Sequence, residues 1–296
     1  MILTPRDITG ELNVLYSFGA TPGDSTGWKS LDELYTIKPG QVTVVTGWPG
    51  SGKSEWLDCL LVNLAKFEWR IACYSPENWP VAEHVSKVIE KWIGKPFSVG
   101  PTDRMGYDEV LAATEAIDDR MSFMKPIEDD SLGIRAILEQ AEEWHDRFDA
   151  ETGIKRGLVI DPWNEVDHMR PRELTETEYI SRVLSFIRNW ARRTHCHVWI
   201  VAHPAKQARE AGKLPVPRPD MIAGSQNWWN KADCCVTVWR NYEDDNALVE
   251  IHVQKVRFKR VGRIGVIGLR YDRSTGRYFE PARDANGREV YYSMGR

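Results

Sequence analysis

The feature that most constrains this chain of 296 residues is a glycine-rich run that directly follows a short apolar stretch. The run, residues 47–54, reads Gly-Trp-Pro-Gly-Ser-Gly-Lys-Ser, and the β-branched segment Val42–Thr46 precedes it. A strand followed by GxxxxGKS is the sequence form of a phosphate-binding P-loop, because the glycines let backbone N–H groups turn toward the phosphates. The sequence therefore predicts a P-loop nucleoside triphosphatase; a glycine-rich structural turn is the alternative.

Each residue type in the P-loop has an expected task at a bound triphosphate. Lys53 is expected to reach the β and γ phosphates, and Ser54 is expected to hold Mg²⁺. The helix that begins near Lys53 adds the positive end of its dipole. The residues expected to contact the nucleotide are Gly47, Pro49, Gly50, Ser51, Gly52, Lys53 and Ser54.

Strands and helices alternate along most of the chain, which is typical of a parallel α/β sheet. We expect strands at 41–46, 70–75, 121–124, 157–160 and 197–202, and helices at 53–66, 81–92, 107–118, 131–148 and 176–194. After about residue 232 the pattern changes to strands with hairpin turns, at 234–239, 248–255, 262–271 and 277–280. The sequence thus predicts a mostly parallel central sheet with a C-terminal antiparallel extension.

Composition limits where such a protein works. The chain has no stretch of 18 apolar residues and no signal pattern at its start, so we expect an intracellular soluble protein without a membrane partner. The five cysteines show no CxxC spacing, which favours reduced core thiols over a zinc site. Because the net charge is -4, contact with a nucleic acid would depend on local basic patches.

Two acidic residues are candidates for the metal and hydrolysis chemistry. Asp161 ends the apolar strand at 157–160, where parallel α/β sheets bind ligands, and is the candidate Walker B carboxylate. Glu77 follows the strand at 70–75 and is the candidate group that orients or deprotonates the attacking water. An Asp that caps a turn and a solvated surface Glu are the respective alternatives.

The strand at 197–202 ends at His203 and leads into a long basic loop. His203 would face the γ phosphate and could relay its presence to this loop; an ordinary hydrogen-bonded histidine is the alternative. Loops of this length are usually functional or disordered, and positive charge there suits a phosphate backbone, although a solvated loop is the alternative. The candidate DNA contacts are Lys206, Arg209, Lys213 and Arg218.

Two further groups of residues are candidates for nucleic-acid or triphosphate binding. Of the thirteen tryptophans, only the pair Trp228 and Trp229 stands outside clear core patterns and stays open as a base-stacking platform. Lys255 and Arg257 alternate onto one face at a strand end, where they could reach a triphosphate bound by a neighbouring subunit as an arginine finger. A solvated basic hairpin is the alternative for this pair.

Taken together and in order, these motifs resemble the helicase domain of the Twinkle family, a branch of the DnaB-type replicative helicases related to phage primase-helicases. The segments that carry the resemblance are 47–54, 75–78, 159–162, 201–206, 222–225, 230–233 and 254–258. The resemblance covers roughly residues 20 to 280. It implies a RecA-like core in hexameric rings that use ATP and Mg²⁺ to translocate 5′ to 3′ on single-stranded DNA.

The resemblance also implies roles for individual residues. Glu77 becomes the catalytic base, His203 the γ-phosphate sensor and Arg257 the finger supplied in trans, with Lys255 beside it. The loop after His203 matches the DNA-binding loop of the central channel, which ends near Gly224 and Ser225. Implied partners are single-stranded DNA, other copies of the chain, and a DNA polymerase and single-strand-binding protein.

The resemblance divides the chain into three parts. Residues 1–24 are expected to be a linker arm whose short amphipathic helix grips a neighbouring subunit, 25–282 the RecA-like helicase ATPase domain, and 283–296 a C-terminal tail. Full-length relatives carry a primase-like or zinc-binding region ahead of the linker, for which this sequence has no room and no cysteine pattern, so primer synthesis is not expected. The short linker leaves the head-to-tail interface to the core.

Three other readings of the same sequence stay open. A RecA-like recombinase or mediator would bind single strands without unwinding, but it usually adds a polymerisation segment, which is not evident here. A small-molecule P-loop kinase would need a lid and an acceptor site. A non-catalytic module that uses ATP only to lock a ring would not need Glu77.

Overall fold

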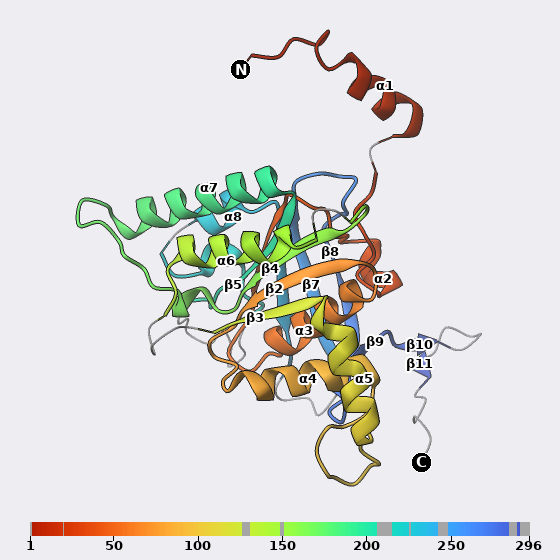
Figure 1. Cartoon of the computed structure of the whole chain (residues 1–296). Coiled ribbons are helices and arrows are strands. Elements are labelled where there is room, and N and C mark those ends of the chain that lie inside the picture. Colours follow the sequence, from red (N-terminus) through yellow and green to blue (C-terminus); the bar gives the residue numbers. More distant parts are fainter. Residues whose placement is uncertain are drawn as a thin grey trace.

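A single mixed sheet organises the chain in the computed structural model, which describes residues 2–19, 21–125, 131–148, 151–205, 215–224, 226–241, 248–283 and 289–290. In these residues nine strands form the sheet in the order β3-β2-β4-β5-β1-β6-β7-β8-β9 (Figure 1). The strands are β1 Val42–Thr46, β2 Trp69–Tyr74, β3 Met121–Met124, β4 Lys155–Ile160, β5 Cys196–Val201, β6 Cys234–Trp239, β7 Leu248–Val256, β8 Gly265–Tyr271 and β9 Tyr278–Phe279. The short strands β10 Ala282–Arg283 and β11 Glu289–Val290 pair separately.

The central strands are apolar because helices cover both faces of the sheet. All residues of β1, β2 and β5 are buried. Alternate residues of β5 enter opposite layers, so Val198 and Ile200 belong to one core cluster while Trp199 and Val201 belong to the other. This alternation sets which helix layer each strand residue contacts.

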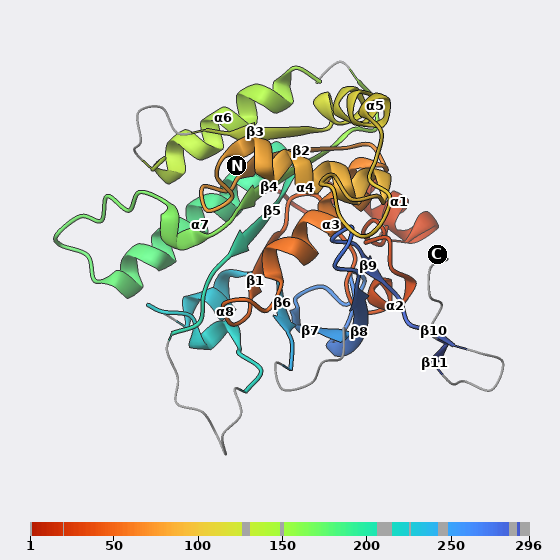
Figure 2. The ribbon, with the colours of Figure 1, turned by 90° about the horizontal axis from the view of Figure 1, so that it is seen from below.

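The helices form two layers, one on each face of the sheet (Figures 1 and 2). One layer holds α3 Lys53–Ala65, α4 Val81–Ile93 and α5 Tyr107–Asp118, and the other holds α6 Ile134–Asp146, α7 Glu176–Thr194 and α8 Asn227–Lys231. The long helix α7 begins with a capping box in which Thr175 and Glu178 satisfy each other's backbone N–H groups. Its apolar side packs Ile180, Val183 and Leu184 into the core.

The arrangement confirms the mostly parallel sheet with antiparallel C-terminal strands, with one correction. The sequence pattern places 234–239 at the start of the antiparallel part, but β6 pairs with β1 in parallel. The antiparallel part begins only at β7, which pairs with β6 and then with β8. Turn signals predict the hairpin between β6 and β7. They do not predict the direction of β6 relative to β1, which depends on the crossover through α8.

The N-terminal segment lies apart from the sheet. Helix α1, Thr9–Phe18, has no buried residue, and Figure 1 shows it extending away from the helix layers. The short helix α2, Lys29–Asp32, instead buries Leu31 in the core. Because a ten-residue helix is marginal in water without tertiary packing, the apolar side chains of α1 would gain stability from a partner.

No helix among the described residues is both long enough and apolar enough to span a bilayer. All five cysteines are buried with free thiols, in agreement with the core thiols that their spacing predicts.

Candidate nucleotide site and the cations at the end of β7

Four neighbouring strands bring the predicted nucleotide-site residues to one edge of the sheet. β1, β5, β4 and β2 are parallel, and neighbouring strands end within one residue of each other, with Val45 opposite Val201 and Ile160 opposite Tyr74. The P-loop follows β1, Glu77 follows β2, Asp161 follows β4 and His203 follows β5. The topology therefore gathers residues that are up to about 150 positions apart in the sequence.

The P-loop has a backbone that only glycine accommodates. A Cβ on Gly47 would lie 2.3 Å from the carbonyl oxygen of Val238, and Gly50 and Gly52 have φ angles of 75° and 91°. Pro49 and Gly50 are exposed at the tip of the loop, whereas Ser51 is buried. The loop thus approaches β6 closely and turns its tip to the outside.

Two buried polar groups in the P-loop fit a triphosphate. Among the described residues Ser51 Oγ is buried without a hydrogen-bond partner. Lys53 is 6% exposed, and its Nζ donates to the carbonyl oxygen of Trp48 at 3.2 Å. Both groups would gain strong acceptors from phosphate oxygens, which supports binding of a nucleotide here.

The carboxyl group of Asp161 is poised for a cation. Asp161 is 5% exposed, and burial raises its pKa to about 6, while a hydrogen bond from Ser54 and the charge of Lys53 oppose this rise and the charge of Asp58 adds to it. Lys53 has a lowered pKa, because burial disfavours its charge more than Asp161 and Glu77 favour it. The pair of Ser54 and Asp161 offers the oxygen ligands that Mg²⁺ prefers.

Glu77 and His203 complete this edge. Glu77 is exposed and lies close enough to interact electrostatically with Lys53 and Asp161. His203 has a pKa lowered by burial and by the charge of Lys53, and its Nδ1 is buried without a partner among the described residues. A neutral imidazole beside the P-loop lysine has a free position for a phosphate oxygen.

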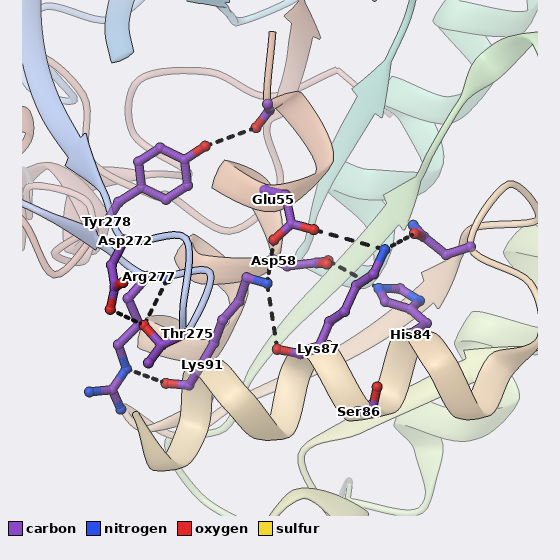
Figure 3. Close-up of polar contacts among 12 residues, drawn as sticks. Glu55, Asp58, His84, Ser86, Lys87, Lys91, Asp272, Thr275, Arg277 and Tyr278 are labelled. Atoms are coloured by element: carbon purple, nitrogen blue, oxygen red, sulfur yellow. Dashed lines mark hydrogen bonds and ion pairs between the residues drawn. The ribbon is translucent and has the colours of Figure 1, made fainter. Parts of the chain in front are cut away.

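A partly buried charge network between α3 and α4 is not evident from the sequence. His84, Lys87 and Lys91 project from α4 toward Glu55 and Asp58 on α3 (Figure 3). Lys91 Nζ, whose side chain is fully buried, lies 2.6 Å from Glu55 Oε2, and His84 Nε2 lies 3.1 Å from Asp58 Oδ1. The network ties the helix after the P-loop to the helix after Glu77.

The same layer connects to the C-terminal strands. Arg277 donates to the carbonyl oxygens of Lys91 and Trp92 at the end of α4, at 2.7 Å and 2.9 Å. Tyr278 donates its hydroxyl to the Gly52 carbonyl at 3.3 Å (Figure 3). Charges three or four residues apart on a helix usually indicate a solvated face, so only the packing of α3 on α4 reveals the charge network between these helices.

The segment expected to bind DNA is only partly described. Lys206, Arg209, Lys213 and Ser225 lie outside the described residues. Arg218 is exposed and its Nε donates to Asp220 at 3.2 Å. Gly224 has a φ of 91° and its carbonyl accepts from Thr177 Oγ1 of α7 at 2.9 Å. We call residues 215–224 the stem of the DNA loop. Its end at Gly224 is anchored to α7.

Polar contacts hold this stem against the nucleotide edge. Trp48 of the P-loop donates its Nε1 to the Pro215 carbonyl at 2.7 Å. The Pro217 carbonyl accepts from Thr237 of β6 at 2.9 Å and from Gln254 of β7 at 3.0 Å. The end of the predicted DNA loop is thus attached directly to the P-loop and to two strands.

Lys255 and Arg257 lie at the edge of the sheet opposite the P-loop. Cys234 begins β6 beside Thr43 of β1 and pairs with Val256 at the end of β7. Three residue steps separate Thr43 from Thr46, the last residue of β1, so about 10 Å of strand lies between this position and the P-loop. The structure does not bring these two cations together with the nucleotide site of the same chain.

Both cations contact the chain that precedes β6. Arg257 lies 3.3 Å from the buried Asp233 carboxylate and donates to the carbonyls of Asn230 and Ala232 at 2.9 Å and 3.2 Å. Lys255 donates to the carbonyls of Trp229 and Ala232. Asp233 belongs to the segment 230–233, to which the sequence alone assigns no role.

The tryptophan pair does not form a platform for bases. Trp228 is fully buried, packs edge-on against Trp163 and donates its Nε1 to the Ala223 carbonyl at 3.2 Å. Trp229 is half-buried, with the Arg218 guanidinium 5.3 Å from its ring. At least one of the two rings is therefore closed to a nucleic-acid base.

The chain is similar to known proteins over nearly its whole length. It is 42% identical over 284 residues, 92% of its length, to the Twinkle homolog protein, chloroplastic/mitochondrial, of Arabidopsis thaliana, and it spans 39% of that relative. No protein-family model matches the chain. These similarities confirm the Twinkle-like resemblance that the motifs indicate.

Two solved structures share the fold. The ATPase domain of G40P matches with a TM-score of 0.77 and 16% identity, covering 95% of this chain and 99% of that one. A DnaB-like replicative helicase, described with its interactions with primase, matches with a TM-score of 0.75 and 16% identity, covering 94% and 68%. The fold is therefore that of the RecA-like helicase ATPase domains.

Proposed function

We propose that this chain, which is Twinkle-like over 92% of its length, is the ATPase motor of a replicative DNA helicase. It would form a ring, most simply a hexamer, that translocates 5′ to 3′ on single-stranded DNA and separates the strands of a duplex. Its site of action would be inside a cell or an organelle, together with a DNA polymerase and a single-strand-binding protein.

The observation that carries the proposal is the division of the site residues between two edges of one sheet. Lys53, Asp161 and Glu77 lie at one edge, and Arg257 lies at the other. A complete site then needs two copies in head-to-tail contact, and repeated head-to-tail contacts close into a ring. This arrangement supports a multi-subunit motor over a monomeric kinase.

The residues of the P-loop edge would hold ATP and Mg²⁺. Lys53 and the P-loop amides would bind the β and γ phosphates, and Ser51 Oγ would find a phosphate oxygen as its missing partner. Ser54 and Asp161 would hold Mg²⁺, which supplies charge neutralisation between the β and γ phosphates. Asp161 would bind the metal as the carboxylate, its ionisation favoured by Lys53.

Hydrolysis would draw on both edges. Glu77 would accept a proton from the attacking water while the water oxygen bonds to the γ phosphorus. The bond between the γ phosphorus and the β–γ bridging oxygen would then break and release ADP. Arg257 of the partner subunit would stabilise the charge on the transferred phosphoryl group. His203 would donate a hydrogen bond to the γ phosphate and signal its loss to the loop that follows.

The DNA would lie against the loop after His203. The basic residues Lys206, Arg209, Lys213 and Arg218, and the backbone at Gly224 and Ser225, would contact phosphates without reading sequence. The apolar side chains of α1 would pack on a neighbouring copy, because α1 buries none of them within its own chain.

The first test is steady-state ATP hydrolysis with and without long single-stranded DNA, with a forked duplex in parallel and Lys53→Ala as the blank. We expect DNA to stimulate hydrolysis and the fork to separate with a free 5′ strand. Stimulation without strand separation would favour the recombinase-like alternative. A rate of ATP hydrolysis that single-stranded DNA does not change would contradict the proposed motor.

The role of Arg257 in trans has its own test. Arg257→Ala should lose hydrolysis yet bind nucleotide normally, whereas Lys53→Ala should lose both. Mixing the two inactive variants should restore activity, because an Arg257→Ala subunit keeps a complete P-loop edge and a Lys53→Ala neighbour supplies its arginine. A mixture that stays inactive, in oligomers shown to exchange subunits, would contradict action in trans.

A further inference from the structure

The two trans-acting cations are held by the end of the short helix that follows the DNA loop. At the C-terminal end of α8 the Ala232 carbonyl accepts from Lys255 and the Asn230 carbonyl accepts from Arg257. The adjoining Asp233 carboxylate pairs with Arg257. The carbonyl dipoles at a helix end favour positive charge, which adds to these direct contacts. Any movement of this segment therefore moves the acceptors of both cations.

Trp229 connects this helix to the stem of the DNA loop. The Arg218 guanidinium carbon lies 5.3 Å from the centre of the Trp229 ring, and Lys255 Nζ lies 5.9 Å from it. The Trp229 carbonyl is also an acceptor of Lys255 Nζ. One residue of α8 thus contacts a cation of the DNA-loop stem through its ring and a trans-acting cation through its ring and its backbone.

The stem has little freedom to move independently of this contact. Hydrogen bonds to the Pro217 carbonyl from β6 and β7 hold the backbone next to Arg218. The Arg218 side chain is nevertheless 54% exposed, so it can still contact DNA. A DNA phosphate that draws Arg218 away from the Trp229 ring would remove one of the two cation contacts of this ring. The contact with Lys255 would remain.

We propose that Trp229 is a positioning residue that couples DNA binding at Arg218 to the placement of Lys255 and Arg257 in the neighbouring nucleotide site. The inference rests on the proposed function, since it assumes a DNA-stimulated ATPase with cations supplied in trans. DNA bound at one subunit would then accelerate hydrolysis at the site of the subunit next to it.

The test compares three variants at saturating single-stranded DNA. Trp229→Leu removes the aromatic ring, Trp229→Phe keeps one, and Trp144→Leu removes a half-buried ring from the same core cluster at α6, away from the loop. Trp229→Leu should lower the DNA stimulation of hydrolysis at least about fivefold, the smallest effect typical of coupled sites, with DNA affinity within about twofold of wild type. Trp229→Phe and Trp144→Leu should retain most of the stimulation.

Each contrary result identifies a different failure. Normal stimulation in Trp229→Leu, or an equal loss in Trp144→Leu, would overturn the coupling. Weakened DNA binding with normal stimulation at saturation would make Trp229 a DNA contact instead. A wild-type protein that DNA does not stimulate would refute the proposed function, and with it the inference.

A mixing experiment tests whether the coupling acts on the neighbour. Lys53→Ala subunits hydrolyse nothing but keep Trp229, Lys255 and Arg257 intact. Adding them to Trp229→Leu subunits should raise DNA-stimulated hydrolysis per Trp229→Leu subunit, because some sites then receive cations from a coupled neighbour. If the added subunits only dilute the activity, the coupling acts within one subunit and the inference is wrong.

Discussion

Replacing Asp161 by asparagine should stabilise the nucleotide-free protein while it abolishes ATP hydrolysis. Asp161 is 5% exposed and lies near a second buried carboxylate, Asp58, so its ionised form is disfavoured in the fold. Asparagine has almost the same shape and can still accept the hydrogen bond from Ser54, but it carries no charge. The variant removes a charge that hydrolysis requires but that destabilises the nucleotide-free fold, a trade-off that is typical of catalytic sites.

The size and sign of this effect follow from the pKa. Burial raises the pKa of Asp161 from 3.8 to about 6. The folded protein therefore binds more protons than the unfolded chain between about pH 4 and pH 6, and stability falls as the pH rises through this range. Because one pKa unit corresponds to about 1.4 kcal/mol, ionisation costs up to about 3 kcal/mol at pH 7. Asp161→Asn should avoid most of that cost.

The assay is equilibrium unfolding in urea, without nucleotide or divalent metal, at pH 4 and pH 7.5. We expect Asp161→Asn to exceed wild type by about 1 to 3 kcal/mol at pH 7.5, or about 2 to 8 °C in Tm, and by less than about 1 kcal/mol at pH 4. Equal or lower stability of the variant at pH 7.5, or a gain that does not change with pH, would refute the reasoning.

Asp58→Asn is the matched control because the same chemical change should have the opposite sign. The partners His84, Lys91 and Lys87 lower the pKa of Asp58 even though burial opposes them. Its stabilising contribution is present above the unfolded-state pKa and is lost as the pH falls. Asp58→Asn should therefore destabilise the protein at pH 7.5, and most of this loss should persist at pH 4, which lies just above the ordinary pKa of 3.8.

Two further substitutions probe the layer beneath the site and the P-loop itself. Glu55→Gln removes the carboxylate that pairs directly with the fully buried Lys91 ammonium, which then keeps only the nearby charge of Asp58, and should cost about 3 kcal/mol in urea unfolding, whereas Lys91→Met leaves a partly exposed Glu55 and should cost less. The reverse order would contradict the burial argument. Gly47→Ala places a Cβ 2.3 Å from the Val238 carbonyl and should weaken binding of a fluorescent ATP analogue about tenfold or more; unchanged affinity would show that the loop relaxes freely.

The strands and the P-loop were predictable because their signals are local. A β-branched run before GxxxxGKS predicts β1 and the start of α3 at Lys53, and the structure has both. The apolar run before Asp161 predicts β4, and the apolar run before His203 predicts β5. In each case the hydrophobic pattern over four to six residues is enough, since these strands are buried on both faces.

The direction of β6 and the surroundings of the tryptophan pair were not predictable in this way. The apolar segment 234–239 has the same pattern in a parallel or an antiparallel strand, so only the chain crossover decides. Trp228 is buried against residues far away in the sequence, with its ring edge-on to Trp163, about 65 positions earlier. The ion pair of Glu55 with Lys91 likewise depends on how two helices meet, which charge spacing within one helix does not reveal.

The reversal of strand direction after β6 has a mechanical consequence for the proposed motor. Because β6 runs parallel to β1, its first residues lie at the edge opposite the P-loop, and β7 returns the chain to that edge at Val256. A cation placed after an antiparallel β7 therefore faces away from its own triphosphate, whereas the end of β6 lies beside the P-loop at Val238. The stem at Pro217 contacts both strands, since Thr237 and Gln254 donate to the same carbonyl. A shift of that stem would move β6 near the chain's own nucleotide and β7 near the cations that serve the neighbour's nucleotide. A single DNA contact could therefore affect hydrolysis at two successive sites.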